Sequence, residues 1–134
     1  GLGDVYKRQM YVAQKKYSKA LRIYDSIYNQ FQNHSLNDDI LFRKSQVFKI
    51  QQMQDKAIDA LKQLEEEFPG SIILDKALFS IAKLYEEDLN DFESAKKYYR
   101  KILFDHPSSL YVIDARKRFR KLSGKTNQNI NKNS

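Results

Sequence analysis

One apolar pattern occurs three times along the chain, and it limits the possible folds more than any other feature. A small residue is followed at steps of four, three and four by larger residues that are mostly apolar, which is the spacing of one helix face. The alanines that begin the three copies lie 37 and 38 residues apart. A repeat of this length predicts stacked helical units. The copies are Ala20, Tyr24, Ile27 and Phe31; Ala57, Leu61, Leu64 and Phe68; and Ala95, Tyr99, Ile102 and His106.

A second apolar stripe lies before the second and third copies of this pattern. Its members are Leu41, Ser45 and Phe48 in one unit and Leu78, Ala82 and Tyr85 in the next. The two stripes of a unit cannot be buried by one helix alone, so we expect two helices packed against each other. Each unit is therefore predicted to be an antiparallel helix pair.

Polar residues and prolines mark the expected helix ends. Asn90 stands where the second helix of a unit should begin, and Glu93 follows three residues later. This spacing predicts a capping box, in which Asn90 accepts from a free backbone N–H group. Pro69 and Pro107 follow the end of a stripe, and proline disfavours helical geometry in the residue before it. These positions predict where the units are joined.

With both stripes in phase, the sequence resembles the tetratricopeptide repeat (TPR) family. The family has a small residue and an aromatic on the first helix, a small and a large residue on the second, and a final proline. The resemblance covers roughly residues 11–122 and departs from the family in its longer period, in Gln54 at an aromatic position and in Gln32 at a proline position. The matching residues are Ala82, Tyr85, Ala95, Tyr99 and Pro107, and Ser45, Phe48, Ala57, Leu61 and Pro69.

The resemblance implies an all-α fold, a right-handed α-solenoid of about seven helices in antiparallel pairs. One TPR-like domain would span residues 10–122. Gly124 is placed to end the last helix, and residues 123–134, rich in Asn and Lys, are predicted to be disordered. The expected units are 10–33, 38–70 and 72–108, followed by a capping helix at 110–122.

The first nine residues are expected not to belong to the natural protein. Residues 4–9 are what the bases GAT GTG TAT AAG AGA CAG encode, which resembles the transposon end used to prepare sequencing libraries. Met10 follows at once. The other interpretation is an ordinary helical segment. We interpret residues 1–9 as a translated adapter and leave them out of functional reasoning; the chain would then be a C-terminal fragment.

Positive charge is concentrated near the C-terminus. Residues 10–110 hold 15 basic and 15 acidic residues, whereas residues 111–134 hold seven basic and one acidic. The simpler interpretation is a solvated face of the capping helix. The alternative function is contact with nucleic acid or an anionic surface. The candidate basic patch consists of Arg116, Lys117, Arg118, Arg120 and Lys121.

No group of residues indicates catalysis. The chain has no cysteine, and its two histidines, His34 and His106, lie apart without nearby ligand residues. Glu86 and Glu87 are adjacent on a helix and point about 100° apart, which does not suit an acid–base pair. No apolar run approaches the ~20 residues of a membrane span. We predict a non-enzymatic protein without metal or cofactor.

What remains is a binding surface. In TPR folds the first helices line a concave groove that holds a peptide or protein segment, so the resemblance implies a protein-interaction scaffold here. Aromatic side chains contribute strongly to binding, which favours Phe42 and Phe79. The alternative is that these two rings pack against neighbouring helices. The family's groove positions fall on Phe42, Gln46 and Lys49, and on Phe79, Lys83 and Glu86.

Two short junctions add a weaker resemblance. Residues 68–71 and 106–109 share an aromatic-Pro-x-Ser pattern with TPR proteins of bacterial cell envelopes, such as outer-membrane assembly lipoproteins and periplasmic division proteins. A periplasmic or outer-membrane-associated setting is therefore favoured. Nucleic acid is not an expected partner, and the identity of the protein partner and the oligomeric state stay open.

Overall fold

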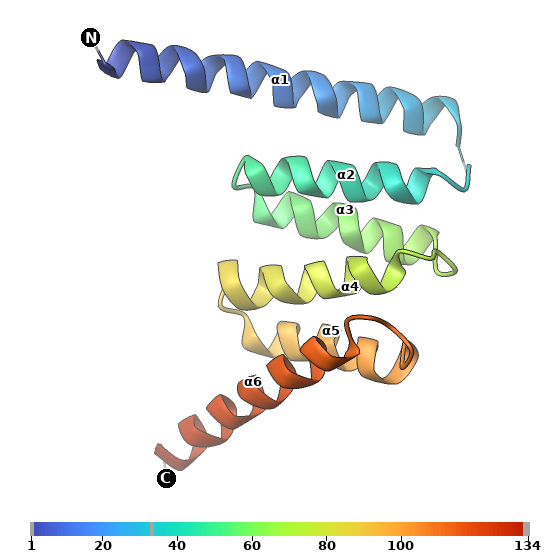
Figure 1. Ribbon diagram of the computed structural model, residues 1–134, viewed down its shortest axis with the longest axis vertical. Coiled ribbons are helices and arrows are strands. Elements are labelled where there is room, and N and C mark those ends of the chain that lie inside the picture. The colour runs from blue at the N-terminus through green and yellow to red at the C-terminus, as the bar shows by residue number, and fades with distance from the viewer. Residues whose placement is uncertain (1, 33, 133–134) are drawn as a thin grey trace. The chain divides into compact units, whose positions relative to one another are not determined.

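All the regular secondary structure that the structure describes is helical. The computed structural model describes residues 2–32 and 34–132, and the side chains of residues 3–124 other than 33. These residues contain α-helices joined by short turns and no strand, which confirms the predicted all-α fold. The elements in Figure 1 are α1 (Leu2–Gln30), α2 (Asn37–Ile50), α3 (Gln54–Glu67), α4 (Leu74–Lys83), the π-helical η1 (Leu84–Asp88), α5 (Phe92–Asp105) and α6 (Val112–Lys132).

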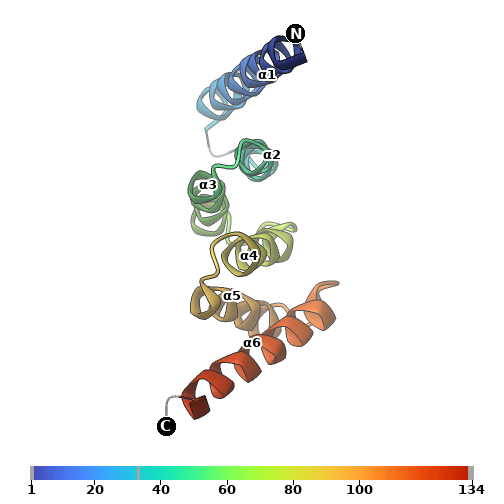
Figure 2. The same cartoon turned by 90° about the vertical axis from the view of Figure 1, so that its left-hand side faces the viewer.

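The helices form two compact parts, Gly1–Ala60 and Leu61–Ser134, with the boundary inside α3. In the first part α1 packs on α2. In the second, α5 lies between α4 and α6, as Figure 2 shows. The predicted stripe of α5 forms the core there, since Ala95, Tyr99 and Ile102 are fully buried.

The first predicted helix pair is one continuous helix. The first unit, residues 10–33, was predicted to be a helix pair, but α1 runs unbroken from Leu2 to Gln30. Residues 10–31 contain neither glycine nor proline, so nothing in this stretch interrupts the backbone hydrogen bonds of a helix. The described residues therefore hold six α-helices where about seven were predicted.

The last helix also extends beyond its predicted end. Helix α6 continues through Gly124 to Lys132, so the helix end at Gly124 was wrong, and the tail predicted to be disordered is helical up to Lys132. A single glycine costs a helix only about 1 kcal/mol relative to alanine, and no proline follows it.

The turns that join one unit to the next share one hydrogen-bond pattern. Ser71 Oγ accepts from the backbone N–H of Ile73 at 3.2 Å, and Ser109 Oγ accepts from that of Tyr111 at 3.0 Å. At the corresponding place, His34 Nδ1 accepts from the backbone N–H two residues on at 3.1 Å. The backbone N–H of His34, Ser71 and Ser109 each donates to the carbonyl three residues back. These three residues are therefore equivalent, which aligns the units residue by residue.

The turns within a unit each contain one left-handed residue. Gln52 has a φ of 61° and Asn90 a φ of 52°. Asn90 thus reverses the chain, a conformation that asparagine tolerates better than most residues. The predicted capping role of Asn90 was wrong, because Asp91 caps α5 by accepting from the backbone N–H of Ser94 at 3.2 Å.

The π-helical turn η1 holds one extra residue. Phe48 and Tyr85 occupy equivalent positions 37 residues apart, whereas Gln52 and Asn90 are 38 residues apart. One residue is therefore inserted between the last aromatic of the first helix and the turn. The backbone N–H of Leu89 donates to the carbonyl five residues back at 3.1 Å, one residue further than in an α-helix. The two repeat lengths of 37 and 38 follow from this turn.

Candidate functional site

The six residues predicted to contact a partner lie on the first helices of their units. On α2, Gln46 and Lys49 are exposed. On α4, Lys83 is half-buried. The two phenylalanines that we favoured as contacts are instead buried, Phe42 at 7% and Phe79 at 9% exposure. The alternative interpretation, packing within the fold, describes both rings in the structure.

Phe79 on α4 contacts the ring of Tyr99 on α5 and the ring of Tyr111, the residue before α6. Its ring stacks on Tyr111, with centroids 4.9 Å apart and planes at 27°, and meets Tyr99 edge-on at 5.9 Å. The cationic ends of Lys83 and Arg118 lie 5.9 and 6.0 Å from its centroid. Phe79 thus holds the start of α6 against α4, while the two cations border it on the surface.

Glu86 is the centre of a buried polar network. It lies in η1 with 8% exposure. Its Oε1 accepts from the hydroxyl of Tyr99 at 2.7 Å and from Nη1 of Arg118 at 3.2 Å. Arg118 also donates to Oε1 of Glu87 at 3.0 Å. The equivalent residue of the second unit, Lys49, precedes no inserted residue and is exposed, so Glu86 is a structural anchor of α6 more than an open contact.

Both partners of Glu86 have raised pKa values. Burial, followed by the hydrogen bond to Glu86, raises the pKa of Tyr99 well above its ordinary value. Burial would lower the pKa of Arg118, but the hydrogen bonds to Glu86 and Glu87 outweigh it and raise that pKa. The raised pKa values keep Tyr99 neutral and Arg118 charged at ordinary pH.

The candidate basic patch is divided by the structure. Arg116, Lys117, Arg120 and Lys121 are exposed on α6. Arg118, with a side chain 29% exposed, points back to η1 and is paired with two carboxylates. The expectation that all five charges stand free in water was wrong for Arg118.

Two further groups were missed in the sequence. Tyr85 and Tyr98 stack with centroids 5.9 Å apart, and the Nζ atoms of Lys62 and Lys101 lie 5.4 Å from the Tyr85 ring and 4.8 Å from the Tyr98 ring. Asn37 is buried, and its Nδ2 donates to the carbonyl of Phe31 at 2.7 Å. The spacing of Tyr85 and Tyr98 gave no signal, because the pair forms only when η1 folds onto α5.

The described residues hold no cluster of His, Asp and Glu able to bind a metal ion. No described helix is both long enough and apolar enough to cross a membrane.

The fold is thus a series of antiparallel helix pairs in which small residues, aromatics and inter-unit turns recur in register. The tetratricopeptide repeat family model matches residues 39–71 and 76–109, half of the chain. The chain belongs to the tetratricopeptide repeat family. Repeats of this family generally mediate protein–protein interaction and are typically non-catalytic. The comparison with curated proteins found no match.

Proposed function

We propose that this chain is a scaffold that binds a peptide or protein segment along the first helices of its repeats. The observation that carries the proposal is the family match over two consecutive repeats. Gln46 and Lys49 on α2, and Lys83 on α4, are the predicted contact residues with accessible side chains. The rings of Phe42 and Phe79 are buried beneath this surface.

Charge substitution tests this proposal without disturbing the core. The probe is a peptide selected from a displayed random library on the full chain. Replacing Lys49 and Lys83 together by Glu should weaken that peptide at least tenfold, because both side chains would face the bound segment. Lys97→Glu on α5, whose side chain is also exposed, is the matched control and should leave the affinity unchanged. Equal affinities for all three proteins would contradict the proposal.

A bacterial cell-envelope setting is the second part of the proposal, and it rests on the two aromatic-Pro-x-Ser junctions. In the fold their serines, Ser71 and Ser109, serve as turn acceptors, so the motif also has a local structural reason. Fractionation of native cells with an antibody to the chain is the test. Recovery with periplasm or outer membrane is expected, and recovery with cytosol would refute this part alone.

A further inference from the structure

Three lysines gather around the stacked tyrosine pair in the second part of the chain. Tyr85 on η1 and Tyr98 on α5 lie with ring centroids 5.9 Å apart and planes at 25°. The Nζ atoms of Lys101, Lys97 and Lys62 lie 4.8, 5.9 and 6.0 Å from the Tyr98 centroid. No two of these ammonium groups can be further apart than twice the last distance, so their charges interact. We call these three residues the lysine cluster.

The lysine cluster belongs to one repeat and not to the packing pattern that the repeats share. Counted from the alanine that begins each stripe, the same positions of the preceding copy carry no positive charge. The aligned residues are Asp25 for Lys62, Asp59 for Lys97 and Gln63 for Lys101. The position of Tyr98 is likewise Ala60 in the preceding copy. Helix packing in this fold therefore does not require lysines at these places.

One carboxylate is paired with the lysine cluster. Glu65 Oε2 on α3 lies 3.0 Å from Lys101 Nζ on α5. Lys97 is exposed, and Lys62 and Lys101 are half-buried, so solvent reaches all three side chains. Three positive charges and one negative charge give the group a net charge of +2. A bound anion would lower the repulsion between ammonium groups held this close together.

The hydroxyl of Tyr98 adds a donor whose position is fixed. The residue is only 5% exposed, so its ring is held by packing. No described residue hydrogen bonds to the hydroxyl, and its oxygen keeps contact with solvent. Burial raises the pKa of Tyr98, and the charges of Lys62 and Lys101 oppose that rise, so both charges act on the hydroxyl. A donor held in place in this way costs little ordering when it binds a ligand.

These groups suit a phosphoryl group. An ammonium group and a tyrosine hydroxyl can both donate hydrogen bonds, and neither lysine nor tyrosine brings a negative charge at ordinary pH. A phosphoryl group on a side chain carries a charge of about −1.5 to −2 and three acceptor oxygens. Its charge thus matches the net charge of the lysine cluster with Glu65, whereas a carboxylate carries one negative charge.

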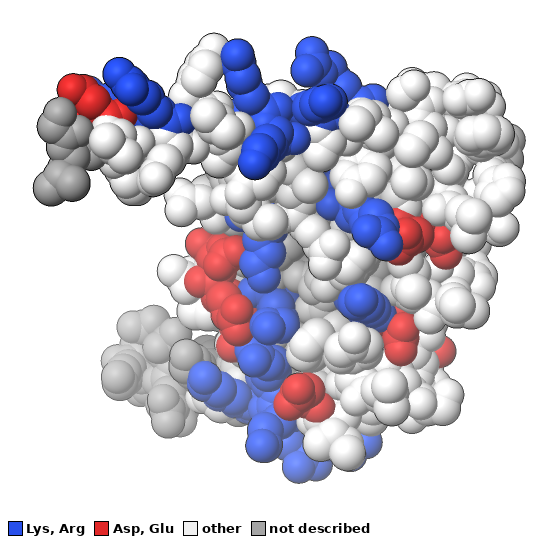
Figure 3. Space-filling model, turned by 45° about the horizontal axis from the view of Figure 1, so that its top comes forward, with Lys and Arg blue, Asp and Glu red and all other residues white. Residues whose placement is uncertain are grey.

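Neighbouring carboxylates limit the ligand to a compact anion. Glu66 and Asp105 are exposed and lie four residues after Lys62 and Lys101, so they share the helix faces of these lysines. Figure 3 shows Asp and Glu side chains beside many of the Lys and Arg side chains. An extended polyanion, such as nucleic acid or an anionic membrane, would meet these carboxylates. A single phosphoryl group would not.

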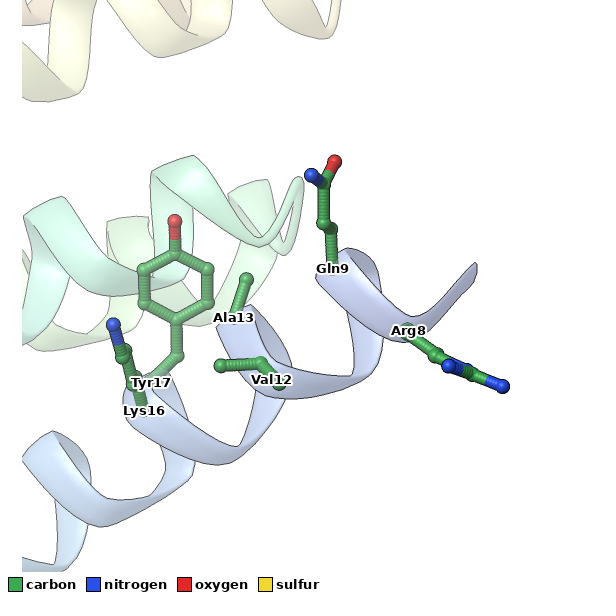
Figure 4. A pocket seen from close by; sticks show the side chains of 6 residues that line it. All are labelled: Arg8, Gln9, Val12, Ala13, Lys16 and Tyr17. Carbon is green, nitrogen blue, oxygen red and sulfur yellow. The ribbon is translucent and has the colours of Figure 1, made fainter. Parts of the chain in front are cut away.

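The hollow beside α1 offers no comparable group of donors. It has a volume of about 470 Å³ and is lined by α1 alone (Figure 4). Its cations, Arg8 and Lys16, are eight residues apart on one helix, which corresponds to about 12 Å along the helix axis. The lysine cluster instead draws its charges from two helices onto one ring.

We propose that the lysine cluster and the hydroxyl of Tyr98 bind the phosphoryl group of a phosphorylated side chain on a partner protein. The ammonium groups balance its charge, and the hydroxyl donates to one of its oxygens. The site lies on the second helices α3 and α5, not on the first helices that line the proposed groove. It therefore does not depend on the proposed function.

A pentapeptide with one phosphoserine between glycines is the direct probe. Titrated into the full ¹⁵N-labelled chain, it should shift the amide signals of residues 62 and 97–101 saturably in NMR spectra. The same peptide with glutamate in place of phosphoserine should bind at least fivefold more weakly, because it carries less charge and fewer acceptors. The unmodified serine peptide should not bind. Equal binding of the phosphoserine and glutamate peptides would overturn the proposal.

Variants test the named donors. Lys62→Gln with Lys97→Gln should weaken the phosphopeptide at least tenfold, and Tyr98→Phe, which keeps the ring, at least threefold. Lys56→Gln is the matched control, because Lys56 Nζ lies 6.0 Å from the ring of Phe48 on the same surface type, and its affinity should be unchanged. Circular dichroism should be the same for all variants. Unchanged affinity in the double variant or in Tyr98→Phe would overturn the proposal.

Two further probes separate the sources of a phosphate. Inorganic phosphate that binds while the phosphopeptide does not would indicate an adventitious ion only, and that result overturns the proposal. Vesicles of phosphatidylcholine with phosphatidylserine should not bind through these residues. Vesicle binding that Lys62→Gln with Lys97→Gln abolishes would overturn the proposal as well, since the surface would then serve a membrane.

Discussion

Helices α1 and α5 carry the same stripe and differ in what surrounds it. Helix α5 lies between two helices, and Ala95, Tyr99 and Ile102 are inaccessible to solvent. Among the described residues α1 packs on α2, and Ile27 and Phe31 keep 37% and 51% of their surface exposed. A repeat stripe thus specifies which residues can be buried, while the neighbouring helices decide how much burial each unit obtains. The stability of each unit should therefore depend on how much of its stripe is buried.

The largest effect is expected from truncating the isoleucine of each stripe. Ile102→Ala should lower the free energy of unfolding by about 2–5 kcal/mol, because it leaves a cavity between packed helices. Ile27→Ala should cost less, about 1–2 kcal/mol, since 37% of its surface already meets water. Urea denaturation followed by circular dichroism measures both. Equal losses would show that α1 is covered as well as α5.

Enlarging the alanine of each stripe tests the same contrast from the opposite side. Ala95 lies where α5 meets its neighbours, so Ala95→Leu should overpack the site and cost about 1–3 kcal/mol. Ala20→Leu should cost less than Ala95→Leu, because Ala20 is only half-buried. Thermal melts of the two variants measure both changes in stability. A neutral Ala95→Leu would show that Ala95 is not a close-contact residue.

Two arginines of α6, one paired and one exposed, provide the next comparison of stability. Arg118→Gln should cost about 1–2 kcal/mol, because Glu86 and Glu87 lose a charged donor and Glu86 is nearly buried. Arg116→Gln, an exposed change on the same helix, should stay within about 0.5 kcal/mol. Chemical denaturation compares them. If the two variants are equally stable, the network around Glu86 does not anchor α6.

The smallest effect is expected on the affinity of the chain for nucleic acid. Weak attraction, no tighter than ~10⁻⁶ M at physiological salt, is all that the exposed basic residues of α6 should give. Arg116→Gln with Arg120→Gln keeps Arg118 paired and should change that affinity little in filter binding to duplex DNA or single-stranded RNA. A tighter affinity that falls steeply with salt and is lost in the double variant would establish the alternative function.

The core could be predicted because it depends on local periodicity. The stripe residues Ala57, Leu61, Leu64, Ala95 and Ile102 are all buried as predicted. The continuity of α1 also had a signal that we missed, since Met10, Ala13 and Tyr17 extend the stripe before Ala20 at helical steps. The π-helical turn had one as well, in the change of repeat length from 37 to 38.

The candidate site was harder to predict because it depends on contacts between distant residues. Glu86 was expected to face a partner, but its burial requires the hydroxyl of Tyr99 and the guanidinium of Arg118, which lie 13 and 32 residues away. Phe79 was favoured as a partner contact, with packing in the fold as the alternative, and Tyr111 before α6 covers it. Helix periodicity identifies the face on which a residue lies, whereas the neighbour that reaches it is set by the tertiary fold.

Hydrogen exchange followed by mass spectrometry tests the central contrast most directly. Amides of α5 should exchange slowly, because the helix opens only with its unit, whereas those of residues 20–30 in α1 should exchange much faster. Equal protection of α1 and α5 would contradict the account.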